Sequence, residues 1–204
     1  MFEVDFKTYQ GWITKYVNNH DTREINFQND VVKRLLENLY PQYDIVCVDT
    51  KGSDSKNHDY YKYSGSYVDV KTKKKKPTTP DLLICKDWDW FNRNNDKISY
   101  FATVEVKSPY GKEAIYKYDF KDYFDLWNTK ITRHLSAEKI DIVIFTDTFK
   151  WDIFEKQYSE PKSIILVDRI KRGTGYTYKW KDNAAEEFEK LLKLLDEYLI
   201  NRIK

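Results

Sequence analysis

Two short segments of the chain carry residues that could do chemistry together. Asp81 follows Pro80 at the start of one apolar run, and Glu105 and Lys107 stand at the end of another. A polar turn around Arg93 separates the two runs, which favours an antiparallel pair of strands. In a hairpin centred near Arg93 the numbers of paired residues add up to 186, so we expect Asp81 directly opposite Glu105.

Two carboxylates and one ammonium group should therefore meet on one face of the sheet. Directly paired residues point to the same face, with their Cβ atoms about 4.5 to 5.5 Å apart. Because side chains alternate along a strand, Lys107 shares that face with Glu105, whereas Val106 points the other way. At this distance Asp81 and Glu105 both stay ionised only if a cation or a basic group compensates them.

A hard divalent cation fits this need. Mg²⁺, with Mn²⁺ as a substitute, prefers oxygen ligands and commonly binds through one or two carboxylates, with waters and phosphate oxygens as further ligands. Such an ion polarises a phosphodiester, helps to ionise an attacking water and stabilises charge on the leaving oxygen. Lys107 would orient or activate the water, or stabilise the charge that develops around phosphorus, and the sequence does not separate these roles.

The spacing of Pro80-Asp81 and Glu105-x-Lys107 resembles the signature of the PD-(D/E)XK nuclease superfamily, the fold of many restriction endonucleases. The context from Val104 to Pro109 is common in that superfamily. Segments 144–147 and 151–154 are similar to the strand, turn and tryptophan-containing strand of nuclease domains in type I restriction enzymes. The resemblance covers residues 24 to about 155.

This resemblance implies a catalytic set of Asp81, Glu105 and Lys107. It also implies a metal ion held by Asp81, Glu105 and the backbone carbonyl of Val106. Members of the superfamily often add an acidic residue from the helix before the first core strand.

Glu24 and Glu37 are the candidates for that acidic residue. At about 100° per residue, Glu24 lies near the apolar stripe of its helix, at about 60°, and Glu37 lies opposite it, at about 280°. We therefore favour Glu24 as the additional catalytic residue. The alternative for Glu24 is a first-turn glutamate that only stabilises the helix dipole.

A lysine run immediately upstream of Asp81 is a candidate nucleic-acid contact. It comprises Lys73, Lys74, Lys75 and Lys76, preceded by Lys71. The run could bind phosphates beside the site, with the tyrosines at 60, 61, 63 and 67 stacking on bases. Alternatively it is the solvated tip of a hairpin, as like-charge blocks usually are.

The superfamily often places a Gln, Lys or Tyr on the helix after the Glu-x-Lys strand. Residues 108 to 135 contain no Gln. Lys121 and Tyr123 are taken here as nucleic-acid-binding residues, and Lys117 stays as an unranked third candidate.

The elements that must position these residues follow from periodicity. Helical spacing predicts helices over 5–18, about 24–40 and 119–135, and a C-terminal helix capped by Asp182 or Asn183. Short apolar runs predict strands at 44–48, 81–85, 98–106, 141–145, 151–154 and 164–167. This order predicts an α/β fold with a restriction-endonuclease-like mixed β-sheet flanked by helices.

Length and composition set outer limits. The 204 residues carry 35 Lys and Arg against 33 Asp and Glu, a net charge of +2, which excludes a histone-like polycation. We expect a single domain over 1–204, with a helical extension at 1–23, the core at 24–155, and C-terminal strands and a helix at 156–204. The cysteines and histidines lack zinc spacing. The absence of a long apolar run or a signal-like start predicts a cytoplasmic protein without a membrane partner.

The sequence thus predicts a magnesium-dependent endonuclease acting on nucleic acid, DNA rather than RNA, in restriction, defence, or phage or mobile-element DNA processing. A homodimer or a larger defence or processing complex is the expected assembly. The alternative is a catalytically silent nucleic-acid- or protein-binding module on the same fold, for example a phage counter-defence protein.

Overall fold

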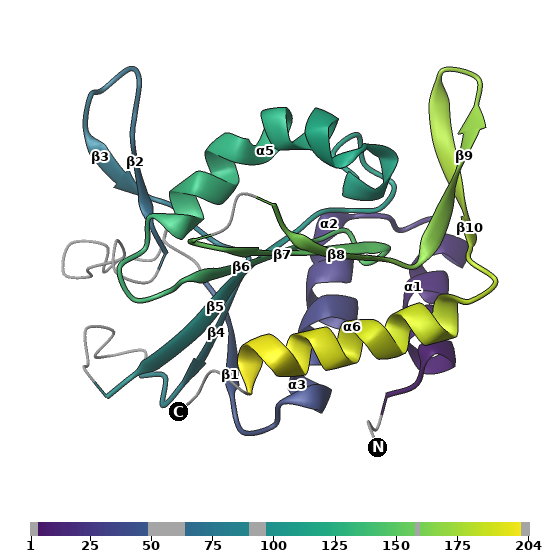
Figure 1. Ribbon diagram of the computed structural model, residues 1–204, viewed down its shortest axis with the longest axis horizontal. Helices are drawn as coiled ribbons and strands as arrows, with labels where there is room; N and C mark the ends of the chain where they lie inside the picture. Colours follow the sequence, from purple (N-terminus) through teal and green to yellow (C-terminus); the bar gives the residue numbers. More distant parts are fainter. Residues whose placement is uncertain (1–3, 49–63, 90–96, 158–159, 201–204) are drawn as a thin grey trace.

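A six-stranded mixed sheet forms the centre of the computed structural model, which describes residues 4–48, 64–89, 97–157 and 160–200, except the side chains of 120 and 123–128 (Figure 1). The strand order is β1-β4-β5-β6-β7-β8. β5 and β6 run parallel, and the other neighbours are antiparallel. The strands are β1 (Asp44–Cys47), β4 (Leu82–Lys86), β5 (Ser99–Val106), β6 (Ile142–Thr146), β7 (Lys150–Glu155) and β8 (Lys162–Ile165).

Helices cover both faces of this sheet, as the sequence predicts (Figure 1). One face carries α1 (Phe6–Asn18), α6 (Ala184–Leu199) and a continuous helix made of α2 (Glu24–Phe27), η1 (Gln28–Lys33) and α3 (Arg34–Leu39). The other face carries α5 (Phe120–Leu135), which follows the short 3₁₀ turn η2 (Ile115–Lys117). The expected mixed sheet flanked by helices is therefore confirmed.

Strand alternation divides the core between the two faces. In β5, Val104 and Val106 pack in the cluster that contains the residues of α1, α3 and α6. In β6, Val143 and Phe145 pack against Ile131 of α5. Glu105 lies between Val104 and Val106, so its side chain points to the α5 side of the sheet. The strand pattern thus decides which helix meets the carboxylate.

The predicted helices agree with the structure, with one local difference. The middle of the second helix, η1, is a π-helical stretch, which the periodicity of the sequence does not reveal. The N-terminal cap of α6 is Asn183, one of the two expected caps, but its side chain makes no capping hydrogen bond. The turn expected around Arg93 lies outside the described residues.

Two small hairpins project beside the sheet (Figure 1). The first pairs β2 (Ser66–Val68) with β3 (Lys75–Pro77), and the second pairs β9 (Val167–Arg172) with β10 (Gly175–Trp180). The sequence predicts only one short strand at 164–167. In the structure β8 ends at Ile165, and after Leu166 a separate strand, β9, starts at Val167. β9 is exposed after Val167, whereas Tyr176, Tyr178 and Trp180 alternate with polar residues in β10, and Tyr178 and Trp180 pack against the core. The prediction missed this second strand.

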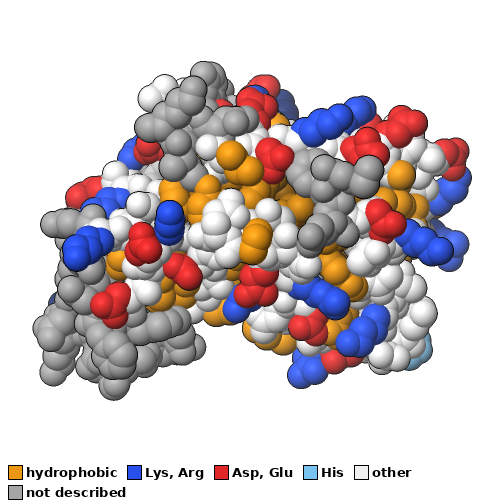
Figure 2. Space-filling view, turned by 90° about the horizontal axis from the view of Figure 1, so that it is seen from below, with side chains coloured by type: hydrophobic (Ala, Val, Ile, Leu, Met, Phe, Trp, Pro, Cys, Tyr) orange, Lys and Arg blue, Asp and Glu red, His pale blue; other side chains and the backbone are white. Residues whose placement is uncertain are grey.

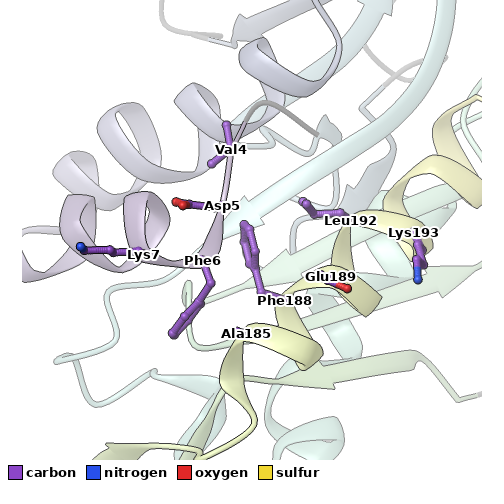
Figure 3. Close-up of a pocket in the computed structure, with 9 residues that line it drawn as sticks. All are labelled: Val4, Asp5, Phe6, Lys7, Ala185, Phe188, Glu189, Leu192 and Lys193. Atoms are coloured by element: carbon purple, nitrogen blue, oxygen red, sulfur yellow. The ribbon is translucent and has the colours of Figure 1, made fainter. Parts of the chain in front are cut away.

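An apolar hollow of about 560 Å³ lies between the start of α1 and α6 (Figure 3). Phe6, Phe188 and Leu192 line it, and charged side chains of both helices surround it. Its residues are separate from those of the carboxylate site. Within the described residues, helices of the length and apolarity that a membrane crossing requires do not occur.

The turn between β6 and β7 depends on the buried carboxylate of Asp147. It accepts hydrogen bonds from the backbone N–H groups of Tyr116 (2.8 Å), Phe149 (3.1 Å) and Lys150 (2.8 Å). The side chain thereby ties the turn to η2, the segment that leads into α5.

We predict that Asp147→Ala lowers the free energy of unfolding by about 2 to 5 kcal/mol, because three buried donors lose their acceptor. Asp141→Ala is the matched control, since Asp141 is 70% exposed and its ion pair with Lys156 should contribute less than about 1 kcal/mol. Urea unfolding of both variants measures the difference. Equal stabilities would show that the Asp147 carboxylate does not hold the turn.

Candidate active site

The register of β4 and β5 places Asp81 across from Glu105. Leu82 pairs with Val104, so the pairing continued by one residue brings the two carboxylates together. Asp81 Oδ2 accepts a 2.7 Å hydrogen bond from the backbone N–H of Val106. The sum of 186 expected for paired residues holds from Leu82 to Ile84, and a bulge shifts the register beyond that point. Only the part of the hairpin next to the carboxylates follows the simple geometry.

Glu105 is the buried centre of the site, with 2% of its surface exposed. Its Oε1 contacts the ammonium groups of Lys107, at 2.7 Å, and Lys130. Its Oε2 lies 3.5 Å from Nε2 of His134, and within the described residues neither atom makes a hydrogen bond. Burial disfavours the carboxylate, but His134, Lys107 and Lys130 outweigh it and lower the pKa of Glu105 to about 2. Glu105 therefore stays ionised.

Lys107 is buried as well, with 3% of its surface exposed. Its Nζ donates to Glu105 Oε1 and, at 2.9 Å, to the backbone carbonyl of Val106. Burial opposes the charged form, but the carboxylates of Glu105, Asp81 and Glu24 outweigh it and raise the pKa of Lys107. The side chain is a fixed ammonium group inside the site.

Glu24 reaches the same ammonium group from the start of the second helix. Both of its carboxylate oxygens lie 3.4 Å from Lys107 Nζ. Glu37 lies elsewhere on that helix and pairs with Lys33 at 3.6 Å on the surface. The structure thus brings Glu24, and not Glu37, to Lys107, as the helical phase predicts. The side chain of Glu24 is 41% exposed, so it closes the solvent side of the cluster.

Two further contacts hold Asp81 and the start of this helix in place. Gln28 of η1 donates to the backbone carbonyl of Asp81 at 3.2 Å. Ser108, after β5, donates to the carbonyl of Thr22 at 2.7 Å. The π-helical stretch that contains Gln28 is of a kind found often at functional sites. Burial and the charge of Glu105 raise the pKa of Asp81 to about 7.

Sequence reasoning missed Lys130, His134 and Gln28. Lys130 and His134 stand four residues apart on α5, so both point from one side of that helix toward Glu105. That i,i+4 spacing was the available signal for a shared site, but a lone histidine in a helix is usually interpreted as a core residue. His134 is also buried and its Nδ1 lies 3.3 Å from the carbonyl of Ser64.

The expected nucleic-acid contacts lie outside this cluster. Lys73 and Lys74 lie in the turn of the first hairpin, Lys75 and Lys76 lie on β3, and Lys76 pairs with Asp69 at 2.8 Å. Lys121 is exposed on the first turn of α5, and the side chain of Tyr123 lies outside the described residues. Of the tyrosines expected to stack on bases, 60, 61 and 63 lie outside the described residues. The ring of Tyr67 is covered by the Arg133 guanidinium, 4.1 Å from its centroid.

A polar hollow of about 370 Å³ opens next to the buried carboxylate. Lys130 and Arg133 of α5 line one side, and Tyr67, Thr78 and Thr79 line the other. Lys130 contacts Glu105 and also lines this hollow. A substrate group in the hollow would meet Lys130 before it met Glu105.

The oxygen donors have the hard character that Mg²⁺ requires, and Glu105 Oε2 is a buried acceptor that receives no hydrogen bond from the residues that the structure describes. At the same time the Lys107 ammonium is bonded to Glu105 Oε1 and Val106 O, two of the expected ligand atoms. In the described part of the chain, no three His, Cys, Asp or Glu side chains are grouped as a metal site. The donor chemistry fits the ion, and the ammonium groups compete with it.

The sequence matches no protein-family model, and no similar curated protein or solved structure was found. The interpretation of the site therefore depends on the geometry of its own residues.

The raised pKa of Asp81 predicts a pH-dependent stability. Because the folded-state pKa is about 7 against an ordinary value of 3.8, the folded protein binds more protons between these values than the unfolded chain. Relative to Asp81→Asn, the wild type should lose about 2 to 4 kcal/mol of stability as the pH rises from about 4 to 7. Urea unfolding in EDTA at several pH values measures this loss, and a constant difference between the two proteins would contradict it.

Proposed function

We propose that the protein is a metal-dependent nuclease of the PD-(D/E)XK kind that hydrolyses phosphodiester bonds, in DNA rather than RNA. The observation that supports it best is the convergence of Asp81, Glu105 and Lys107 at one end of the β4–β5 pair. Glu24 joins them from a helix before the first strand. These are the residue types and the elements that the resemblance implies. Restriction, defence, or phage or mobile-element DNA processing are the settings in which such an enzyme acts.

Asp81, Glu105 and the Val106 carbonyl are the groups that would hold Mg²⁺ or Mn²⁺. When bound, the ion supplies Lewis acidity toward a phosphoryl oxygen and makes a coordinated water more acidic. The residues of the chain do the rest. Lys107, a buried and permanently protonated group, donates hydrogen bonds to oxygens that gain negative charge during hydrolysis.

Hydrolysis adds water across one phosphorus–oxygen bond. The water oxygen bonds to phosphorus, the leaving oxygen departs as an alcohol, and the water supplies its proton. As one of the groups that would hold the ion, Asp81 would be ionised during the reaction, and a hydrogen bond from the backbone N–H of Val106 fixes its position. Lys130 lies between the polar hollow and Glu105, where it can hold a phosphate oxygen of the substrate.

One observation favours a second function. The two ammonium groups of Lys107 and Lys130 already balance the Glu105 charge, so this carboxylate is stable without a metal ion. A catalytically silent nucleic-acid- or protein-binding module could keep such a cluster for its contribution to the fold. Metal uptake separates the two functions.

Replacing Lys107 tests the proposal. Lys107→Met keeps most of the buried stem but removes the ammonium that bonds to Glu105 and Val106 O. We predict that the variant takes up Mn²⁺ at least as well as the wild type, measured by calorimetry, while DNA cleavage falls by about 10² to 10⁴-fold. Unchanged cleavage would remove Lys107 from the mechanism, and a wild type that takes up no Mn²⁺ would favour the silent module.

The second helix offers a matched pair of glutamates. Glu24→Gln should lower cleavage by about tenfold or more, because one charge next to Lys107 is lost. Glu37→Gln on the same helix should leave cleavage unchanged, since its side chain is half exposed and pairs only with Lys33 among the described residues. Single-turnover cleavage of a DNA duplex compares the two. If both variants cut equally, Glu24 has no part in the reaction.

A further inference from the structure

The two small hairpins carry a large excess of positive charge. Residues 64–77, which contain β2 and β3, hold five lysines and one aspartate, a net charge of +4. Residues 167–180, which contain β9 and β10, hold four cationic residues and one aspartate, a net charge of +3. The whole chain has a net charge of +2, so the remaining residues carry −5. The positive charge is thus concentrated in two short β-hairpins.

Both hairpins rise on the side of the sheet that α5 covers (Figure 1). They meet opposite ends of that helix. Arg169 of β9 pairs with Asp119, the residue that precedes α5, at 3.1 Å. At the other end, Ser136 Oγ accepts a 2.9 Å hydrogen bond from the N–H of Ser66 in β2. The helix therefore sets the spacing of the two hairpins.

The first hairpin is fixed tightly to the end of α5. Gly65 has a φ of +80°, and a Cβ atom there would lie 1.9 Å from the carbonyl oxygen of Arg133. The guanidinium of Arg133 in turn lies over the Tyr67 ring. The first residues of this hairpin therefore pack directly on α5, and the lysines of its turn project from that anchored segment.

A hollow with cationic side chains lies at each junction between a hairpin and α5. The hollow beside the first hairpin, of about 370 Å³, contains Lys130 and Arg133. The hollow beside the second, of about 580 Å³, contains Lys112, Lys117 and Arg169 together with Asp119 and Asp122. Cationic side chains thus line the surface at both ends of the helix.

The opposite side of the molecule looks different. The view from below shows Lys and Arg side chains interspersed with Asp and Glu, with hydrophobic side chains between them (Figure 2). Interspersed charges of both signs give a weak field, whereas the two hairpins, with net charges of +4 and +3, attract a polyanion. The charge segregation thus singles out the α5 side.

We infer that the two hairpins form one binding surface for the phosphate backbone of a nucleic-acid duplex that lies along α5. Two arms anchored at the ends of one helix suit a stiff duplex, because a duplex shorter than its persistence length of about 150 base pairs spans them without bending. Tyr67 and Tyr176 lie against Arg133 and Arg169, so these rings strengthen the arms rather than stack on bases. The inference rests on the proposed function for the identity of the duplex as substrate.

The length of α5 sets the size of the footprint. Its 16 residues span about 24 Å at 1.5 Å per residue. A duplex rises about 3.4 Å per base pair, so about seven base pairs separate the two arms. A stem of four base pairs is too short to reach both arms, and a stem of twelve reaches them easily.

The test is binding of four- and twelve-base-pair DNA and RNA stems to the full chain in EDTA, which prevents metal-dependent cleavage. Fluorescence anisotropy over a range of KCl concentrations gives affinity and salt slope. The variants are Lys171→Ala with Arg172→Ala on the second hairpin and Lys73→Ala with Lys74→Ala on the first. The control is Lys190→Ala with Lys193→Ala on α6, which lies on the other face of the sheet.

We expect the twelve-base-pair stem to bind about tenfold more tightly than the short one, with either hairpin variant removing most of that gain. Each variant should also lower the salt slope by about 2, one for each lost phosphate contact. The α6 control should bind as the wild type does. Comparison of DNA with RNA stems shows which backbone the protein binds more tightly. Tighter binding of either one supports the proposed surface, provided that both hairpin variants weaken it.

A Lys171/Arg172 variant that binds like the α6 control at every salt concentration overturns the inference, as does absence of binding to every stem. Cleavage by the wild type, measured separately with Mg²⁺, keeps the two proposals apart. Cutting without dependence on the second hairpin refutes the surface alone. Hairpin-dependent binding without cutting refutes the nuclease and leaves the surface in place.

Discussion

The structure depends on one buried charge, the carboxylate of Glu105. A carboxylate taken out of water is costly unless it is paired, and here the compensation comes from two different elements. Lys107 follows the same strand, and Lys130 and His134 come from α5. The contacts of Lys130 and His134 with Glu105 therefore hold α5 over the sheet, in addition to the apolar packing of Ile131. Because both basic hairpins contact the ends of α5, their positions depend indirectly on the same carboxylate.

The other half of the site depends on how the second helix begins. Ser108 holds the segment before that helix, Gln28 holds the backbone of Asp81, and Glu24 meets Lys107. The π-helical stretch has wider turns than an α-helix, so a polar Gln28 can face β4 while Val31 and Val32 stay in the core. Three elements that are distant in sequence thus converge on one ammonium group.

The sequence was informative where burial imposes a pattern. Strand alternation and hairpin symmetry placed Asp81 opposite Glu105, and helical phase separated Glu24 from Glu37, because each of these elements buries one side. It was less informative elsewhere. Most of β9 is exposed and shows no apolar alternation, and the alternation of Tyr176, Tyr178 and Trp180 in β10 was not recognised as a strand. The i,i+4 spacing of Lys130 and His134 places both on one side of α5 but does not reveal their tertiary contact with Glu105. Gln28 was missed because a π-helical stretch leaves no signature in periodicity.

The most direct test of the central claim is cleavage of single-stranded, duplex, nicked and branched DNA, and of RNA, by the wild type and by Glu105→Gln, with Mg²⁺ or Mn²⁺. Folding of the variant is checked by its unfolding transition. We predict metal-dependent cutting of DNA by the wild type, lost in a folded Glu105→Gln protein purified in the same way. Equal cutting by both proteins would contradict it, because the buried carboxylate that organises the site would then have no part in the reaction.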